Sequence, residues 1–369
     1  MKKIIGLLLT FCLISSVLWA QDITMDIGGP THSGVYQTLP LQKFRKVAWK
    51  TEIKGNGQQN CLLKNGVLYV SSVLFDQETK TRTGFIYAVE SKNGKIIWEN
   101  SVPHSISSPT LKDSVLYYGS DEVEGKQIAV DARDGKIVWE FKTKLASCYP
   151  PAIIGNKSFF GSHGNRWYVI DNRTGQIIKE RESGTGICCS PSVLDSIVYF
   201  VDWKGVVHAY NANTLLDEWS FNSGNKSLSA PALVDQVAYL VTSDGTLHAI
   251  NIKTGQLKWS VKTDDTLFRS PAVKDSVVTL ISSNGHIYAF NTLDGSVLWD
   301  LKKTGLGYTH TAIVDNLVYV GCADNCLYAL DLKTGKERWK FKAEHPVNTP
   351  LIDNKVVYFT SGKYIYALK

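Results

Sequence analysis

The chain has 369 residues, of which 44% are hydrophobic and 20% are charged, and its formal net charge is +6 at pH 7. This composition is typical of a globular protein with a large core and excludes an intrinsically disordered chain. Loss of Lys2 and Lys3 with a leader would lower the net charge to +4. The other basic residues are dispersed through predicted turns without a run or stripe, so the sequence does not favour nucleic-acid binding.

Residues 1–20 have the pattern of a secretory signal peptide. Lys2 and Lys3 precede the apolar stretch IIGLLLTFCLISSVLW, and small Ala20 marks the expected cleavage site. A signal anchor is the alternative, although the apolar part is shorter than a usual membrane span. Cys12 follows a bulky Phe where a lipoprotein signal needs a small residue, so we do not expect lipidation. We therefore expect a periplasmic or otherwise exported protein without a transmembrane span in its mature part.

Tryptophan recurs about every 40 residues along the rest of the chain. Each one closes a version of the same phrase, such as AVDARDGKIVW, AINIKTGQLKW or ALDLKTGKERW. A period of this length indicates a repeat architecture. The tryptophans at this spacing are Trp98, Trp139, Trp219, Trp259, Trp299 and Trp339, and the empty position in the series holds Lys179.

Each repeat has the pattern of four short antiparallel strands. Residues 270–301 contain four runs rich in Val, Ile, Tyr, Phe and Trp, which are separated by turn residues such as Asn-Gly and Asp-Gly, and no helical period is present. Four such strands form a propeller blade. We expect the recurrent Trp to pack against the neighbouring blade. We expect a positive φ at the Gly of each TG or DG turn, namely Gly94, Gly135, Gly175, Gly255, Gly295 and Gly335.

The two ends of the chain predict how the ring closes. The last segment, TPLIDNKVVYFTSGKYIYALK, supplies three strands, and residues 46–50 supply a fourth strand that carries Trp49. Seven complete units and this shared unit make eight blades, with an insertion at 75–84 in the first. We predict an all-β, eight-bladed β-propeller of four-stranded antiparallel blades over residues 45–369, its last blade closed by an N-terminal strand. Residues 21–44 form a lead-in.

The repeat phrases YALDLKTGKERW and SPAV…DSVV…SSNGHIYAF resemble those of the PQQ-type β-propeller family, over about residues 28–369. That family is usually eight-bladed and includes the outer-membrane assembly factor BamB and the quinoprotein alcohol dehydrogenases. Resemblance to BamB implies a non-catalytic exported scaffold, without a cofactor, that binds an envelope protein through its blade loops; we expect it to be monomeric. Resemblance to the dehydrogenases implies the alternative, a PQQ-dependent enzyme or PQQ-binding relative that uses calcium.

The segments that enter the innermost strands carry the candidate binding residues. Strand alternation predicts that the residue two positions before each Pro, or its equivalent, points toward the mouth of the central channel. A solvated rim without a specific pocket is the alternative. His310 joins this set, whose other members are Gln59, Ser107, Tyr149, Cys189, Ser229, Arg269, Thr309 and Asn348.

The cofactor alternative depends on a pair of adjacent cysteines, Cys188 and Cys189. Adjacent cysteines can close a strained ring disulfide, and in the PQQ-dependent alcohol dehydrogenases such a pair stacks on the quinone. Arg269, Asp202 and Trp203 complete this candidate set. The calcium ligands and the catalytic Asp of those enzymes have no recognisable counterpart in this sequence. Acidic residues of the blade loops are expected first of all as turn residues.

Export places the mature cysteines in a compartment that permits disulfides, but sequence leaves their pairing open. Cys322 and Cys326 flank a tight turn and could form a cross-strand disulfide. A metal cluster of Cys148, Cys188, Cys189 and His163 matches no zinc spacing, so no metal is expected. No Ser-His-Asp order, phosphate loop or paired carboxylates stand out, and no catalytic residue is assigned. The mature cysteines are Cys61, Cys148, Cys188, Cys189, Cys322 and Cys326.

Overall fold

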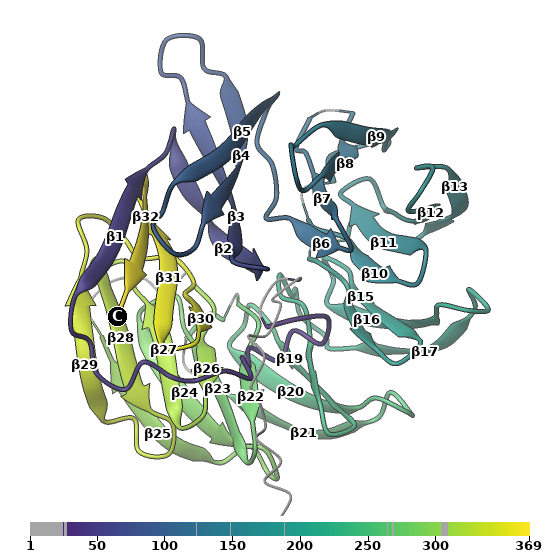
Figure 1. Ribbon diagram of the computed structural model, residues 1–369. Coiled ribbons are helices and arrows are strands. Elements are labelled where there is room, and N and C mark those ends of the chain that lie inside the picture. Colours follow the sequence, from purple (N-terminus) through teal and green to yellow (C-terminus); the bar gives the residue numbers. More distant parts are fainter. Residues whose placement is uncertain are drawn as a thin grey trace, which may run out of the picture.

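The computed structural model describes residues 25, 28–122, 124–147, 149–187, 189–263, 265–267, 269–303 and 309–369, with the backbone alone at 58 and 59. The predicted signal peptide lies outside these residues, and it stays a prediction, as do the domain boundaries. The described residues form eight four-stranded antiparallel sheets arranged in a ring, which confirms the predicted propeller (Figure 1). In this part of the chain no helix has the length and hydrophobicity to span a bilayer.

Seven blades are each built from four consecutive strands, ordered from the inside of the ring outward. Blade 1 contains β2 (Asn56–Lys64), β3 (Val67–Phe75), β4 (Arg82–Glu90) and β5 (Ile96–Pro103). Blade 2 contains β6 (Thr110–Lys112), β7 (Val115–Gly119), β8 (Lys126–Asp131) and β9 (Ile137–Lys142). Blade 3 contains β10 (Ala152–Ile154), β11 (Lys157–Ser162), β12 (Arg166–Asp171) and β13 (Ile177–Glu182). Blade 4 contains β14 (Ser192–Leu194), β15 (Ile197–Val201), β16 (Val206–Asn211) and β17 (Asp217–Asn222).

The remaining blades continue this order until the termini meet. Blade 5 contains β18 (Ala232–Val234), β19 (Val237–Val241), β20 (Thr246–Asn251) and β21 (Leu257–Lys262). Blade 6 contains β22 (Ala272–Lys274), β23 (Val277–Ile281), β24 (His286–Asn291) and β25 (Val297–Lys302). Blade 7 contains β26 (Ala312–Val314), β27 (Leu317–Gly321), β28 (Cys326–Asp331) and β29 (Glu337–Lys342). Blade 8 contains β30 (Leu351–Asp353), β31 (Val356–Ser361), β32 (Tyr364–Leu368) and the N-terminal β1 (Val47–Glu52).

The N-terminal strand closes the ring as the sequence predicts. β1 pairs antiparallel with β32, and Trp49 stands opposite Ala367. The insertion in blade 1 lengthens the β3–β4 hairpin, whose last paired residues are Phe75 and Arg82. Because the first and last strands share one blade, the ring leaves no open gap between the chain ends.

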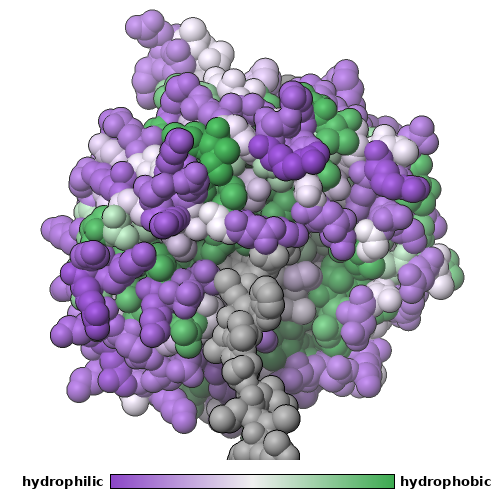
Figure 2. Space-filling view, in the orientation of Figure 1, coloured by the Kyte–Doolittle hydropathy of each residue, from purple (hydrophilic) through white to green (hydrophobic). Residues whose placement is uncertain are grey.

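Each blade has a buried middle and an exposed outer strand. The third strand of blade 6, β24, is buried over its four central residues, whereas the outer strand β25 alternates between buried and exposed positions. Apolar side chains from neighbouring blades form shared clusters between the sheets. Hydrophilic residues predominate on the surface shown in Figure 2, with apolar residues exposed in scattered patches.

The recurrent tryptophans join neighbouring blades, as expected. The indole N–H of Trp139 donates to the carbonyl of Asn172 at 2.7 Å, and Trp219, 80 residues later in the series, donates to Ile252 at 2.7 Å. Trp49, Trp98, Trp259 and Trp299 make the equivalent bond to Ser91, Ala132, Thr292 and Leu332. A buried indole N–H requires an acceptor, so each bond fixes the ring against the next blade.

The same rings determine where glycine is needed. The Trp299 ring covers the turn of the next blade at Gly335, whose φ is +68°. A Cβ built on Gly335 would lie 2.8 Å from that ring, and at Gly255 it would lie 2.8 Å from the ring of Trp219. The glycines are therefore required both for a left-handed backbone and for close approach of an aromatic ring.

The junction of blades 3 and 4, where Lys179 interrupts the series, uses a different set of contacts. The turn position that faces Lys179 holds Leu215 instead of Gly, at φ 56°. Lys179 Nζ donates to the carbonyl of Leu215 at 3.3 Å, and Lys157 Nζ donates to the carbonyl of Ala212 at 2.9 Å. At the junctions named above, the carbonyl at the position equivalent to Ala212 accepts the hydrogen bond from the tryptophan indole. Because no ring covers this turn, a side chain fits there.

An arginine and two further aromatic rings fill the same junction. The Arg181 guanidinium lies 5.1 Å from the ring centroid of Tyr210 and 5.7 Å from that of Trp167, and it pairs with Asp217 at 2.8 Å. The rings of Trp167 and Tyr210 are 4.5 Å apart. Cation–π and aromatic contacts therefore replace the missing tryptophan.

The lead-in supplies the contact that the blade 8 turn cannot make. The termini interrupt that turn, and the Trp339 indole donates instead to the carbonyl of Leu41 at 2.8 Å. Upstream, the lead-in crosses the inner strands of blades 4–7, and Pro30, Thr31, Ser33 and Gly34 accept backbone bonds from Val193, Leu233, Val273 and Ile313. Figure 1 shows this purple segment crossing the green blades. It occupies part of the central channel.

Substitution of Gly335 by Ala should destabilise the protein by about 3 kcal/mol, because it adds backbone strain and a clash with the Trp299 ring. Gly155→Ala is the matched control: Gly155 has a φ of +56° but no atom within 4 Å of an added Cβ. The control should cost about 1 kcal/mol. Urea unfolding of both variants measures the difference, and equal losses would show that the ring contact has no effect.

Lys179→Trp and Leu215→Gly should each destabilise the blade 3–4 junction when made alone. Made together they restore the ring-on-glycine contact of the other junctions, so we expect a favourable coupling of about 1–2 kcal/mol in a double-mutant cycle. The cycle is measured by urea unfolding of wild type, both single variants and the double variant. Additive losses would mean that the two positions do not depend on each other.

Candidate functional site

One face of the ring, the funnel face, carries the links between blades and the loops that join the second and third strands. A pocket of about 580 Å³ opens in its centre. The structure places five of the predicted residues on the pocket wall, namely Ser107, Tyr149, Cys189, Arg269 and His310. Cys188 and the side chain of Gln59 lie outside what the structure describes.

Several predicted polar residues bond within their own blade instead. Thr309 Oγ1 donates to the carbonyl of Gly321 at 2.6 Å, 12 residues later. Ser229 Oγ bonds to the carbonyl of Val241, also 12 residues later, at 3.3 Å. The expectation that all eight side chains point to the channel mouth is therefore wrong for these positions. A small polar side chain here satisfies the backbone at the end of the second strand.

Ser107 and Asn348 also form a hydrogen bond with the residue 12 positions later in their own blade. Ser107 Oγ accepts from the backbone N–H of Gly119 at 2.9 Å while the residue lines the pocket. Asn348 Nδ2 donates to Thr360 Oγ1 at 2.8 Å and to the carbonyl of Gly57 at 3.0 Å, and it is not on the pocket wall. Three larger or less polar residues at this register, Tyr149, Cys189 and Arg269, line the pocket together with Ser107.

Asp202 and Trp203 lie on the funnel face but not on the pocket wall. Asp202 is almost fully buried and accepts from the backbone N–H groups of Lys204 and Val206, both at 2.9 Å, which is the role of a turn residue. Burial alone would raise the pKa of Asp202, but its hydrogen bonds, above all with His208, hold it below the usual range. Asp202 is thus occupied by its own loop.

The rim of the pocket has an aromatic edge that the sequence only partly indicated. The Trp203 ring, 44% exposed, lies 5.2 Å from that of His163, which lies 5.8 Å from that of Tyr149. Leu228 lines the pocket and is 46% exposed, and Phe75 of the long β3–β4 hairpin is 43% exposed. Large apolar side chains from blades 1, 3 and 4 and the link into blade 5 thus surround a polar cavity.

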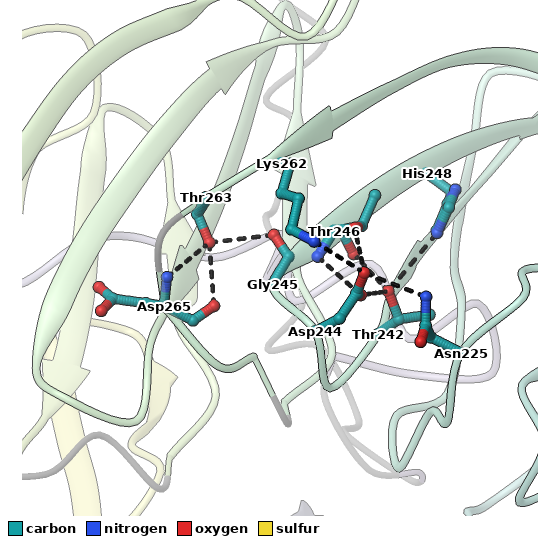
Figure 3. A network of polar contacts seen from close by, with 9 residues as sticks. All are labelled: Asn225, Thr242, Asp244, Gly245, Thr246, His248, Lys262, Thr263 and Asp265. Atoms are coloured by element: carbon teal, nitrogen blue, oxygen red, sulfur yellow. Dashed lines mark hydrogen bonds and ion pairs between the residues drawn. The ribbon is translucent and has the colours of Figure 1, made fainter.

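A polar network holds the funnel-face loop of blade 5 and the links on either side of that blade in place, as Figure 3 shows. Asp244 accepts from the hydroxyls of Thr242 and Thr246 at 2.7 and 3.0 Å and from Asn225 Nδ2 at 3.1 Å. Thr263 Oγ1 donates to the carbonyls of Gly245 and Asp265 at 3.0 Å. The Asp244 carboxylate and the threonine hydroxyls thus stabilise the loop, in keeping with the expected role of Asp244 as a turn residue.

The floor of the pocket contains a histidine that sequence reasoning missed. His32, from the lead-in, is fully buried, has a φ of 50°, and lies near His310 and Arg269 on the pocket wall. Burial lowers the pKa of His32 to about 4, and burial together with the positive charge of Arg269 lowers the pKa of His310 to about 3. The one feature of the sequence that could have indicated this residue is that His32 lies outside the repeats, in the segment THSG.

The cysteines that the structure describes are free thiols. Cys322 and Cys326, which could have formed a cross-strand disulfide, are both buried in the core between blades 6 and 7 without being bonded to each other. Burial raises the pKa of Cys61 and of Cys322 to about 12, so both thiols stay protonated. Cys189 is free and buried on the pocket wall.

The described pocket wall carries little negative charge. Asp121 is the only acidic residue on the described wall, and its two oxygens contact Ser105 N at 2.8 Å and Arg82 Nη1 at 3.4 Å. Nowhere among the described residues do three or more His, Cys, Asp or Glu side chains gather as metal ligands.

The two buried histidines predict a loss of stability in mild acid. A histidine whose pKa is lower in the folded state favours folding above pH 6.5, and this advantage is lost as the pH falls below 6.5 toward the folded-state value. When the pH falls from 7.5 to 5.0, His32 and His310 should each lower the free energy of unfolding by about 2 kcal/mol. The variant His32→Asn, whose Asn tolerates the positive φ, should lose the part of this pH dependence that comes from His32. Urea unfolding at both pH values measures it, and an unchanged pH dependence would contradict the prediction.

Comparison with known proteins places the chain among other propellers. Solved structures with a similar fold include BamB from Moraxella catarrhalis, which is 19% identical with a TM-score of 0.70, over 87% of this chain and 97% of that one. A europium-containing methanol dehydrogenase is 13% identical with a TM-score of 0.78, over 92% and 90% of the two chains. The quinohemoprotein alcohol dehydrogenase of Comamonas testosteroni is 12% identical with a TM-score of 0.78, over 94% and 80%.

These structural likenesses show the fold alone, and comparison with curated protein sequences gave no match. The sequence family is decided by a family model described as outer membrane protein assembly factor BamB. It matches residues 42–188, 182–304 and 283–368, which together span the eight blades. The chain therefore belongs to the BamB family of β-propellers.

Proposed function

We propose that this protein is an exported, non-catalytic scaffold whose funnel face binds a protein partner in the cell envelope. The observation that carries the proposal is the apolar rim, made of large side chains that are 43–46% exposed: Phe75 and Leu228 on the pocket wall, and Trp203 on the funnel-face loop of blade 4. Apolar and aromatic side chains gathered around a pocket are typical of protein-binding surfaces. Membership of the BamB family is consistent with such a role in the envelope.

The loops that carry the rim suit a binding surface because the blades hold them rigidly. Trp203 follows the buried turn residue Asp202, and its backbone N–H donates to the carbonyl of Gly186 at 3.0 Å. Phe75 is in the paired part of the β3–β4 hairpin, opposite Arg82. Ordered anchors lose little conformational entropy when a partner binds, so the rim can contribute affinity at low cost.

A PQQ-dependent dehydrogenase is the second candidate, because Cys189 and Arg269 share the pocket wall. We place it second since Asp121 is the only carboxylate on the described part of that wall and is already bonded. Absorbance titration of the protein with PQQ and calcium, followed by a dye-reduction assay with alcohols, separates the two candidates. Tight binding with turnover would reverse their order.

In-cell photo-crosslinking tests the scaffold directly. A benzophenone amino acid at position 203 or 75 should give a discrete protein adduct, whereas the same group at position 293 should not. Leu293 is 80% exposed but lies in a turn between the third and fourth strands, on the face opposite the funnel. With the captured partner purified, Trp203→Ala should weaken binding at least about tenfold, while Leu293→Ala should not. Equal adducts at 203 and 293, or none at either, would refute the assignment.

A further inference from the structure

The lead-in forms the floor of the funnel pocket. Residues 30–34 accept backbone hydrogen bonds from the innermost strands of four successive blades, so this segment is held along the channel wall. His32 lies within it, and its side chain reaches the pocket together with Ser270 of the link into blade 6. The pocket floor is therefore made from two parts of the chain that are far apart in sequence.

Buried polar atoms at this floor lack partners within the protein. Both ring nitrogens of His32, which is 0% exposed, have no hydrogen-bond partner, and neither has the hydroxyl of Ser270, which is 2% exposed. An unsatisfied buried polar group costs about 1–3 kcal/mol. Both residues line the same cavity, so a polar group bound there is the candidate to complete their hydrogen bonding.

The charges around the floor determine which polar group fits. Arg269 and His310 line the same part of the pocket as His32, and these groups are close enough to influence each other's protonation. The one acidic residue on the described wall, Asp121, is held by Arg82 and by the backbone of Ser105. Arg269 thus brings a positive charge to the floor, while His32 and His310, whose pKa values are about 4 and 3, are neutral at pH 7 and can each donate one N–H.

We propose that this floor binds a carboxylate, supplied by an acidic side chain of the protein that covers the funnel face. Arg269 can bind a carboxylate through two parallel N–H donors, and His32 and Ser270 offer further donors to its oxygens. The surrounding rim contacts apolar residues on either side of that acidic residue. The inference rests on the proposed function and specifies its partner: a loop or terminus with an Asp or Glu between apolar residues.

The pocket is large enough for such an anchor. Its volume of about 580 Å³ exceeds that of an Asp or Glu side chain, and the rim residues Phe75 and Leu228 line the same pocket as Arg269. A buried charge pair of this kind gives specificity, because a partner without an acidic residue at this position cannot form the pair with Arg269.

Calorimetry with two amide-capped peptides, Leu-Asp-Phe and Leu-Asn-Phe, tests the proposal on the purified protein. The Asp peptide should bind about tenfold or more tightly than the Asn peptide. Arg269→Gln should abolish this difference and Arg269→Lys should retain part of it. Arg173→Gln, a highly exposed arginine in the β12–β13 turn, is the matched control and should change nothing. His32→Asn should weaken the Asp peptide several-fold.

Each of the following outcomes would overturn the proposal. Equal binding of the two peptides, or an unchanged preference in Arg269→Gln, would show that no carboxylate is recognised at this floor. Absence of binding by either peptide at millimolar concentration would do the same. Glutarate, a free dicarboxylate, binding more tightly than the Asp peptide would assign the site to a small metabolite instead of a partner. Crosslinks at position 203 that persist in Arg269→Gln would preserve the scaffold function while removing the acidic anchor.

Discussion

The structure depends on one interaction repeated around the ring: an indole N–H of one blade donates to a carbonyl of the next while the ring covers a glycine turn. Trp139, for example, combines its bond to Asn172 with contact on Gly175. Because the donor is buried and the turn has a positive φ, the contact fixes both the distance and the angle between blades. Neighbouring sheets then bury their apolar faces against each other.

At two junctions of the ring, other residues replace part of this interaction. At the blade 3–4 junction, Lys179 and Leu215 replace the ring and the glycine together, and Lys157 donates to the carbonyl left open. At the closing blade, the lead-in offers Leu41 to Trp339 in place of a turn. The same lead-in then continues along the channel and brings His32 to the pocket floor, so ring closure and pocket formation use one segment.

The repeats made the fold predictable from sequence, whereas the site was predictable only in part. Blade number, closure by Trp49 and the glycine turns all follow from spacing and turn chemistry. The register before each inner strand identified Arg269 and Tyr149, but it also selected Ser229 and Thr309, which bond to their own blades. Residue type cannot separate these cases, because a hydroxyl suits both a ligand and a backbone carbonyl. His32 belongs to no repeat, and only the path of the lead-in through the channel places it beside Arg269.

The central claim is that the tryptophan frame is structural and that binding takes place at the funnel floor and rim. Nitrogen-15 NMR of the side chains during titration with the Leu-Asp-Phe peptide tests it most directly. Signals of His32, Arg269 and the exposed Trp203 indole should shift, while the indole signals of the seven interblade tryptophans should stay fixed. Shifts of the interblade indoles with unchanged His32 and Arg269 signals would contradict the account.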